Sequence, residues 1–169
     1  MATTLLLIDL QRNMLEPPEQ VPGAARLIRA VAELLERARA AGVPIVHVRH
    51  NGAEDASDFP GTPGWELYHA PMEGEAIVDK FAADAFAETA LAQLIPAGSR
   101  VVTAGLASDH CVRATVLSGL RQGYAMGLVR GAHGAYDEAG KAGETIEKEV
   151  ERELREAGAE LLEPRTPLF

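Results

Sequence analysis

The stretch that decides the fold is Val101-Val-Thr-Ala-Gly-Leu-Ala-Ser-Asp-His-Cys-Val112. Its apolar beginning predicts a buried strand, and apolar residues return at helical spacing from Val112 to Leu120. Ser108 or Asp109 is expected to cap that helix, which places Cys111, the only cysteine, in its first turn. Free backbone N–H groups and the positive end of the helix dipole both lower the pKa of a thiol there. Cys111 is therefore the first candidate nucleophile.

Outward from this stretch, strand and helix patterns alternate along the chain. Six apolar runs predict strands, at Thr4–Ile8, Val43–Val48, Ala76–Val78, Arg100–Ala104, Tyr124–Val129 and Ala159–Leu162. Helices are predicted at Pro22–Ala41, Ala87–Leu94, Val112–Leu120 and Asp137–Ala157, two of which stop at a glycine. This alternation predicts one α/β domain over residues 1–169, with a six-stranded parallel sheet between two helical layers. The expected strand order is the Rossmann-like 3-2-1-4-5-6.

Composition and charge narrow the class of partner. The 169 residues carry a net charge of −9, which disfavours nucleic acid and anionic membranes because both reward basic patches. A single cysteine cannot form an internal disulfide, and the N-terminus lacks the basic region of a secretion signal. We therefore expect a cytoplasmic protein that acts on a small molecule.

Three chemically active side chains follow three of the predicted strands. Asp9 comes after the first strand, Lys80 after the third and Cys111 after the fourth. Ligands bind beyond the carboxyl ends of strands in such sheets, so a thiol nucleophile, a carboxylate base and an ammonium group could meet there. The same positions would equally suit an inert buried cysteine, a turn-capping aspartate and a solvated lysine.

Three motifs resemble one known family. The segment Gly105–Thr115 resembles the nucleophile segment of isochorismatase-like cysteine hydrolases, especially nicotinamidases. Leu6–Asn13 is similar to that superfamily's opening strand, and Val78–Thr89 to its lysine segment. The motifs occur in the family's order between residue 4 and about residue 137.

The resemblance implies a role for each active residue. Asp9 would be the general base and acid, Lys80 its electrostatic partner and Cys111 the nucleophile. A cis peptide bond between Leu106 and Ala107 is implied, with the N–H groups of Ala107 and Cys111 forming an oxyanion hole. The implied reaction is hydrolysis of a C–N bond through a thioester, without a cofactor. Relatives form dimers or larger assemblies, which makes a homo-oligomer the expectation.

The chain departs from nicotinamidases at their metal site. Those enzymes resemble one another in an Asp-x-His pair after the second strand, whereas this chain has Val48 where the aspartate would stand. His50 and His69 remain without a carboxylate at the required spacing, so we predict no bound metal. Elemental analysis that finds about one metal per chain would contradict this prediction.

Four residues are candidates for binding the substrate. His50 opens the irregular segment 50–74, which also holds Phe59 and Trp65. After the fifth strand, where relatives carry Asp-Ala, the chain has Arg130-Gly-Ala-His133. Arg130 could bind an anionic group of the substrate, although surface roles for Arg130 and His133 are also open.

Two alternatives to amide hydrolysis remain. Isochorismatases, which cleave a vinyl ether, resemble this fold but do not need the cysteine, so Cys111 counts against that reading. The second alternative is a thiol redox or binding protein on the same scaffold. It would leave Asp9 and Lys80 without a purpose.

Overall fold

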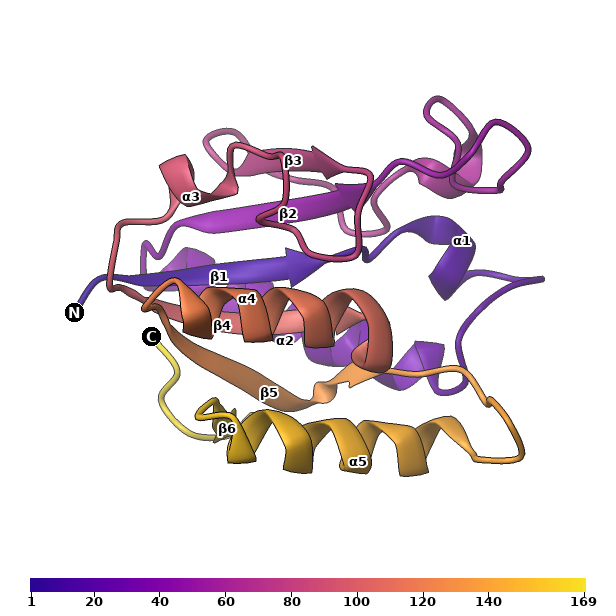
Figure 1. The fold of residues 1–169 in the computed structure, drawn as a ribbon. Helices are drawn as coiled ribbons and strands as arrows, with labels where there is room; N and C mark the ends of the chain where they lie inside the picture. The colour runs from indigo at the N-terminus through magenta and orange to yellow at the C-terminus, as the bar shows by residue number, and fades with distance from the viewer.

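A six-stranded parallel sheet forms the centre of the molecule (Figure 1). The computed structural model describes residues 1–169. The order β3-β2-β1-β4-β5-β6 confirms the predicted 3-2-1-4-5-6 arrangement. The strands are β1 (Thr3–Ile8), β2 (Ile45–His50), β3 (Ala76–Lys80), β4 (Arg100–Leu106), β5 (Ala125–Gly134) and β6 (Glu160–Leu162).

Alternating side chains of the central strands feed two hydrophobic cores. In β1, Leu5 and Leu7 contribute to one core, and Leu6 and Ile8 to the other. All four side chains are buried, because a strand in the middle of a covered parallel sheet is apolar on both faces. The short uninterrupted apolar runs of the sequence thus become the buried strands.

Helices cover both faces of the sheet (Figure 1). The helix α2 (Ala24–Ala40) packs one apolar side against the first core. On the opposite face, α4 (Arg113–Arg121) and α5 (Gly143–Glu156) pack against the second core. The carboxyl ends of the parallel strands lie together at one edge of this three-layer arrangement.

Two predicted helices are shorter than expected, and short turns that the sequence did not predict lie near the carboxyl edge. Only α3 (Leu91–Leu94) forms within 87–94, and α5 begins at Gly143 rather than at Asp137. The single-turn helix α1 (Arg12–Leu15) follows β1, and a 3-10 turn, η1 (Pro63–Trp65), lies in the loop after β2. A π-helical turn, η2 (Ser108–Val112), leads directly into α4.

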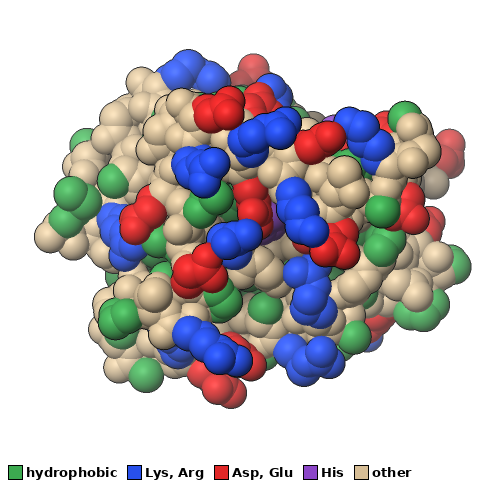
Figure 2. Space-filling model, turned by 90° about the horizontal axis from the view of Figure 1, so that it is seen from below, with side chains coloured by type: hydrophobic (Ala, Val, Ile, Leu, Met, Phe, Trp, Pro, Cys, Tyr) green, Lys and Arg blue, Asp and Glu red, His purple; other side chains and the backbone are tan.

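The surface seen in Figure 2 mixes charges of both signs. Lys and Arg side chains alternate with Asp and Glu on this face, and they form no continuous basic patch there. Across the chain many of these charges are paired, as Arg26 is with Glu147 at 3.1 Å. None of the helices combines the length and the apolar character that crossing a bilayer requires.

Candidate active site

Asp9 lies directly beyond the end of β1 and is almost completely buried. Its backbone adopts a φ of 49°, in the left-handed region that aspartate tolerates better than most residues. Its N–H donates to the carbonyl of Val48 at 3.0 Å, which ties the turn to β2. Asp9 Oδ1 is buried and has no hydrogen-bond partner. One carboxylate oxygen is therefore free to accept a proton.

Lys80 ends β3, and its side chain is fully buried. Its ammonium group lies 2.9 Å from Asp9 Oδ2 and 3.3 Å from Cys111 Sγ. Nζ also donates to the carbonyl of Ala82 at 2.9 Å and lies 3.3 Å from His50 Nδ1. Since an ammonium group has three hydrogens and no lone pair, Nζ can donate to only three of these four neighbouring atoms at a time. The buried ammonium group of Lys80 thus contacts both Asp9 and Cys111.

Cys111 lies in the π-helical turn η2 and is half-buried. Burial, followed by the negative charge of Asp9, raises the pKa of its thiol to about 12, although Lys80 acts in the opposite direction. The expectation of a lowered pKa was wrong, because it counted the helix dipole and Lys80 and omitted desolvation and Asp9. The thiol keeps its proton in the resting site.

Burial also raises the pKa of Asp9, and the ammonium group of Lys80 opposes this shift. A carboxylate with a raised pKa is a stronger base than an exposed one. Asp9 is consequently suited to take a proton from the neighbouring thiol during a reaction and to return it later.

The backbone between β4 and η2 places an N–H group beside the nucleophile turn. The peptide bond between Leu106 and Ala107 is cis, and the N–H of Ala107 donates to no acceptor in the chain. Just before it, Gly105 has a φ of 136°, and a Cβ there would lie 2.1 Å from the carbonyl oxygen of Ile8. Only glycine fits this close approach of β4 to β1.

The predicted capping role of Ser108 and Asp109 is wrong. Ala107 precedes the turn η2, and no side chain caps it. The Ser108 hydroxyl instead forms a 2.8 Å hydrogen bond with His133 Nδ1. The side chain of Ser108 points toward β5, because it bonds to His133, which is distant in sequence, instead of to the N–H groups of the turn.

Gln11 anchors the loop after β2 to the site, and the sequence analysis missed it. Its side chain is buried, donates to the carbonyls of His50 and Trp65 at 2.9 and 3.1 Å, and accepts from the N–H of His50 at 2.8 Å. Its position two residues after Asp9 is the only signal of this role in the sequence. Gln11 thereby fixes where the loop crosses the edge of the sheet.

Of the four substrate-binding candidates, the structure brings His50 to the cluster through Lys80. Trp65 lies in the same loop, donates to Asn51 Oδ1 at 2.8 Å and is stacked under the guanidinium of Arg49 at 3.4 Å from the ring centroid. Phe59 is exposed and lies earlier in this loop than Trp65. Both aromatic residues belong to the loop that Gln11 anchors.

The structure does not bring Arg130 to this cluster. Its guanidinium is paired with Glu151 at 3.2 Å and with Glu163 at 2.8 Å. It lines a hollow of about 580 Å³ beside α5 whose other residues include Arg26 and Glu147. Arg130 is committed to this surface network because two carboxylates satisfy its charge.

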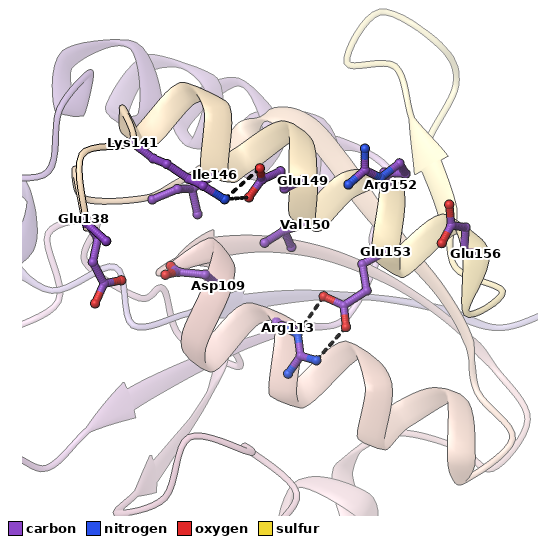
Figure 3. A pocket seen from close by; sticks show the side chains of 11 residues that line it. Asp109, Arg113, Glu138, Lys141, Ile146, Glu149, Val150, Arg152, Glu153 and Glu156 are labelled. Carbon is purple, nitrogen blue, oxygen red and sulfur yellow. Dashed lines mark hydrogen bonds and ion pairs between the residues drawn. The ribbon is translucent and has the colours of Figure 1, made fainter.

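A surface cavity of about 760 Å³ is also separate from Cys111 (Figure 3). It lies between α4 and α5, and its lining is mostly charged. Arg113 on α4 pairs with Glu153 on α5, and Lys141 pairs with Glu149 (Figure 3). Neither Asp9, Lys80 nor Cys111 lines this cavity.

The residues present do not fit a nicotinamidase-like metal. Val48 is a fully buried aliphatic side chain, and His50 Nδ1 faces the ammonium group of Lys80. Elsewhere, Asp109, His110 and Glu138 have potential ligand atoms within 4.8 Å of one another, but this group includes neither His50 nor His69. The chemistry proposed below therefore uses no metal.

Comparisons with known proteins agree on one family. Residues 3–151 match the family described as Isochorismatase domain. Streptothricin hydrolase of Streptomyces noursei is 41% identical over 138 residues, which cover 79% of this chain and 54% of that protein. The chain thus spans about half the length of the streptothricin hydrolases it matches.

Two solved structures extend the comparison to the fold. An isochorismatase from Pseudomonas putida KT2440 has a TM-score of 0.88 at 27% identity, covering 96% of this chain and 88% of that one. Pyrazinamidase of Pyrococcus horikoshii, solved in complex with zinc, has a TM-score of 0.82 at 25% identity, covering 96% and 99%.

Proposed function

Because the chain belongs to the isochorismatase family of hydrolases, we propose that it is a cysteine amidohydrolase that cleaves a C–N bond of a small carboxamide or ureido compound. The observation that carries this proposal is the fully buried ammonium group of Lys80, 2.9 Å from Asp9 Oδ2 and 3.3 Å from Cys111 Sγ. One cation thus faces both a carboxylate with a raised pKa and a thiol.

The first half-reaction forms a thioester. The thiol proton of Cys111 passes to Asp9, whose Oδ1 is free, as Sγ attacks the carbonyl carbon of the substrate. The oxyanion that forms is stabilised by the N–H groups of Ala107 and Cys111, at roughly 3 kcal/mol for each donor. Asp9 then gives its proton to the leaving nitrogen, the C–N bond breaks, and ammonia or an amine departs.

The second half-reaction releases the acid. A water molecule attacks the thioester carbonyl while Asp9 takes a proton from it. The C–S bond then breaks, and the sulfur of Cys111 recovers a proton from Asp9. Lys80 remains positively charged throughout and compensates the negative charge that moves between sulfur and carboxylate.

The raised pKa of Cys111 bears on when the thiol loses its proton, before the attack on the substrate or during it. With a pKa of about 12, almost no thiolate is present at neutral pH, so the thiol must lose its proton to Asp9 as the new bond forms. General-base assistance of this kind contributes typically 10²- to 10⁴-fold to a rate.

The test is release of ammonia or amine from a panel of substrates. The panel contains nicotinamide, pyrazinamide, ureido compounds and streptothricin, which is included because of the name of the 41% identical relative. We expect turnover of at least one compound by the wild-type protein and none by Cys111→Ala, with both folded by circular dichroism. Undiminished turnover by Cys111→Ala would contradict the mechanism.

The same panel separates the alternatives. Pyruvate released from a vinyl-ether acid, with no ammonia from any amide, would indicate isochorismatase chemistry. A stable sulfenic acid on Cys111 after peroxide, with no hydrolysis of any compound, would indicate a redox thiol.

A further inference from the structure

A second buried hydrogen-bonded chain reaches the nucleophile turn from β5 and α5. Ser108 Oγ lies 2.8 Å from His133 Nδ1, and His133 Nε2 lies 3.3 Å from Glu151 Oε1. Ser108 and His133 are both almost completely buried. Neither Asp9, Lys80 nor Cys111 takes part in this chain, which links residues of η2, β5 and α5.

Charge fixes the direction of these hydrogen bonds. Hydrogen bonding to His133 lowers the pKa of Glu151, which is therefore an ionised acceptor. His133 Nε2 must carry the hydrogen of that bond, and in the neutral ring Nδ1 is then the acceptor. In this neutral form the Ser108 hydroxyl donates to Nδ1.

The position of Ser108 links this chain to the proposed chemistry. Ser108 is the first residue of η2, Ala107 precedes it, and Cys111 follows three positions later. In other enzymes a histidine and an acidic residue activate a serine nucleophile. The Ser108 hydroxyl is buried without access to substrate, so it cannot serve as a nucleophile. Its effect must pass through the backbone of the turn.

We propose that His133 and Ser108 are positioning residues that hold η2 so that Cys111 faces Asp9 and Lys80 and the N–H of Ala107 faces the substrate, whereas the Glu151 contact only orients the imidazole ring. This inference rests on the proposed function of Cys111. It assigns a role to His133, whereas Arg130 contacts the other oxygen of Glu151 at 3.2 Å and forms no hydrogen bond with Ser108.

The competing explanation is that His133 is a plain structural anchor between β5 and α5. The two explanations differ in which imidazole nitrogen matters, Nδ1 facing Ser108 or Nε2 facing Glu151. In His133→Asn the amide can still reach Ser108, whereas in His133→Gln it extends toward Glu151 and leaves Ser108 without a partner. An anchor needs the Glu151 contact, whereas a positioning chain needs the Ser108 contact.

The experiment compares His133→Asn, His133→Gln and Ser108→Ala with a matched control, His47→Gln. His47 is a buried histidine on the same sheet whose Nε2 lies 2.8 Å from Glu75, and its side chain forms no hydrogen bond with η2. Two readouts are used: kcat and KM for the best amide of the panel, and the pH midpoint of Cys111 alkylation by iodoacetamide. Thermal unfolding reports the stability of each variant.

We expect His133→Gln and Ser108→Ala to lower kcat roughly 10- to 100-fold with little change in KM, since a misplaced nucleophile affects the reacting geometry. Their alkylation midpoints should fall toward the ordinary thiol value as Cys111 leaves its buried position beside Asp9. His133→Asn and His47→Gln should stay within about 3-fold of wild type in kcat.

Three results would overturn the proposal. They are equal losses in the two His133 variants, a loss in His47→Gln as large as that in His133→Gln, or a wild-type profile for Ser108→Ala. If a His133 variant does not fold, Ser108→Ala decides, because it removes one oxygen atom only. If the wild-type protein hydrolyses no amide, the proposed function fails, while the alkylation midpoints still test the positioning chain.

Discussion

The two ends of β3 carry two ion pairs, one partly buried and one almost completely buried, whose carboxylates have pKa shifts of opposite direction. Glu75 directly precedes this strand and pairs with Arg39, whereas Lys80 ends it and pairs with Asp9. The pKa of Glu75 is lowered to about 2 by its hydrogen bonds with Arg39, Met72 and His47, which outweigh burial. The pKa of Asp9 is raised, because burial outweighs its cation.

Burial and hydrogen bonding together explain the difference, because Asp9 is almost completely buried whereas Glu75 is only partly buried. Glu75 accepts two bonds from Arg39, one from the N–H of Met72 and one contact from His47, so both of its oxygens are occupied. Asp9 has one oxygen bound to the cation and one without a partner. A saturated carboxylate stabilises the fold, whereas a buried carboxylate with a free oxygen is able to exchange a proton.

The largest expected effect comes from neutralising the unsaturated carboxylate. Asp9→Asn should lower kcat by about 10²- to 10⁴-fold, because the amide cannot accept the thiol proton. Glu75→Gln should leave kcat unchanged. Steady-state release of ammonia from the best substrate measures both. A kcat for Asp9→Asn above about a tenth of wild type would remove the proposed general base.

The next effect concerns the cations. Lys80→Met should lower the free energy of unfolding by about 3 kcal/mol at pH 8, because it leaves a buried carboxylate without its partner. The folded pKa of Asp9 then rises further, so the loss should shrink as the pH falls from 8 to 5, because protonation removes the unpaired charge. Urea unfolding at the two pH values measures this.

Arg39→Met is the comparison for Lys80→Met. Its guanidinium side chain is 27% exposed, so we expect a smaller loss of about 1–2 kcal/mol. A Lys80→Met variant that loses the same stability at both pH values would contradict the raised pKa of Asp9.

Alkylation of Cys111 tests whether burial and the charge of Asp9 raise the pKa of the thiol. The rate with iodoacetamide should rise with pH toward a midpoint well above the ordinary thiol value, since the pKa is raised to about 12. In Asp9→Asn the midpoint should fall, because a negative charge beside the thiol is removed. A wild-type midpoint of about 8.5 would show that burial and Asp9 do not control the thiol.

The smallest effect is expected at the saturated carboxylate. Glu75→Gln should cost about 1 kcal/mol at pH 7, because the amide oxygen can still accept a hydrogen bond but the ionised acceptor is lost. Since the folded pKa of Glu75 is depressed, its contribution is present above 4.5 and is lost as pH falls toward 2. The difference between wild type and variant should therefore be smaller at pH 3 than at pH 7 in urea unfolding. A constant difference would contradict the lowered pKa.

The strands and their order could be predicted from the sequence, because short apolar runs report directly on a covered parallel sheet. The helix expected at Ala87–Leu94 could not. Glu88 adopts a φ of 55°, and the Thr89 hydroxyl bonds to the carbonyl of Ala85 and the N–H of Leu91. Local side-chain bonds replaced the helical ones there.

In the site, the position of a residue at a strand end was predictable, whereas its environment was not. Asp9, Lys80 and Cys111 come together as their places after three strands suggested. The direction of the thiol pKa shift depends on burial, and the fate of Ser108 and Arg130 depends on partners 25 and 21 residues away. Such contacts exist only once β5 and α5 are in place.

The enclosure of Lys80 offers a way to watch the site open. The chain has three lysines, and the side chains of Lys141 and Lys148 are 52% and 68% exposed, against 0% for Lys80. An amine-acylating reagent should therefore mark Lys141 and Lys148 at once. It should reach Lys80 only in molecules whose site has opened, so the mass of one peptide would count those molecules.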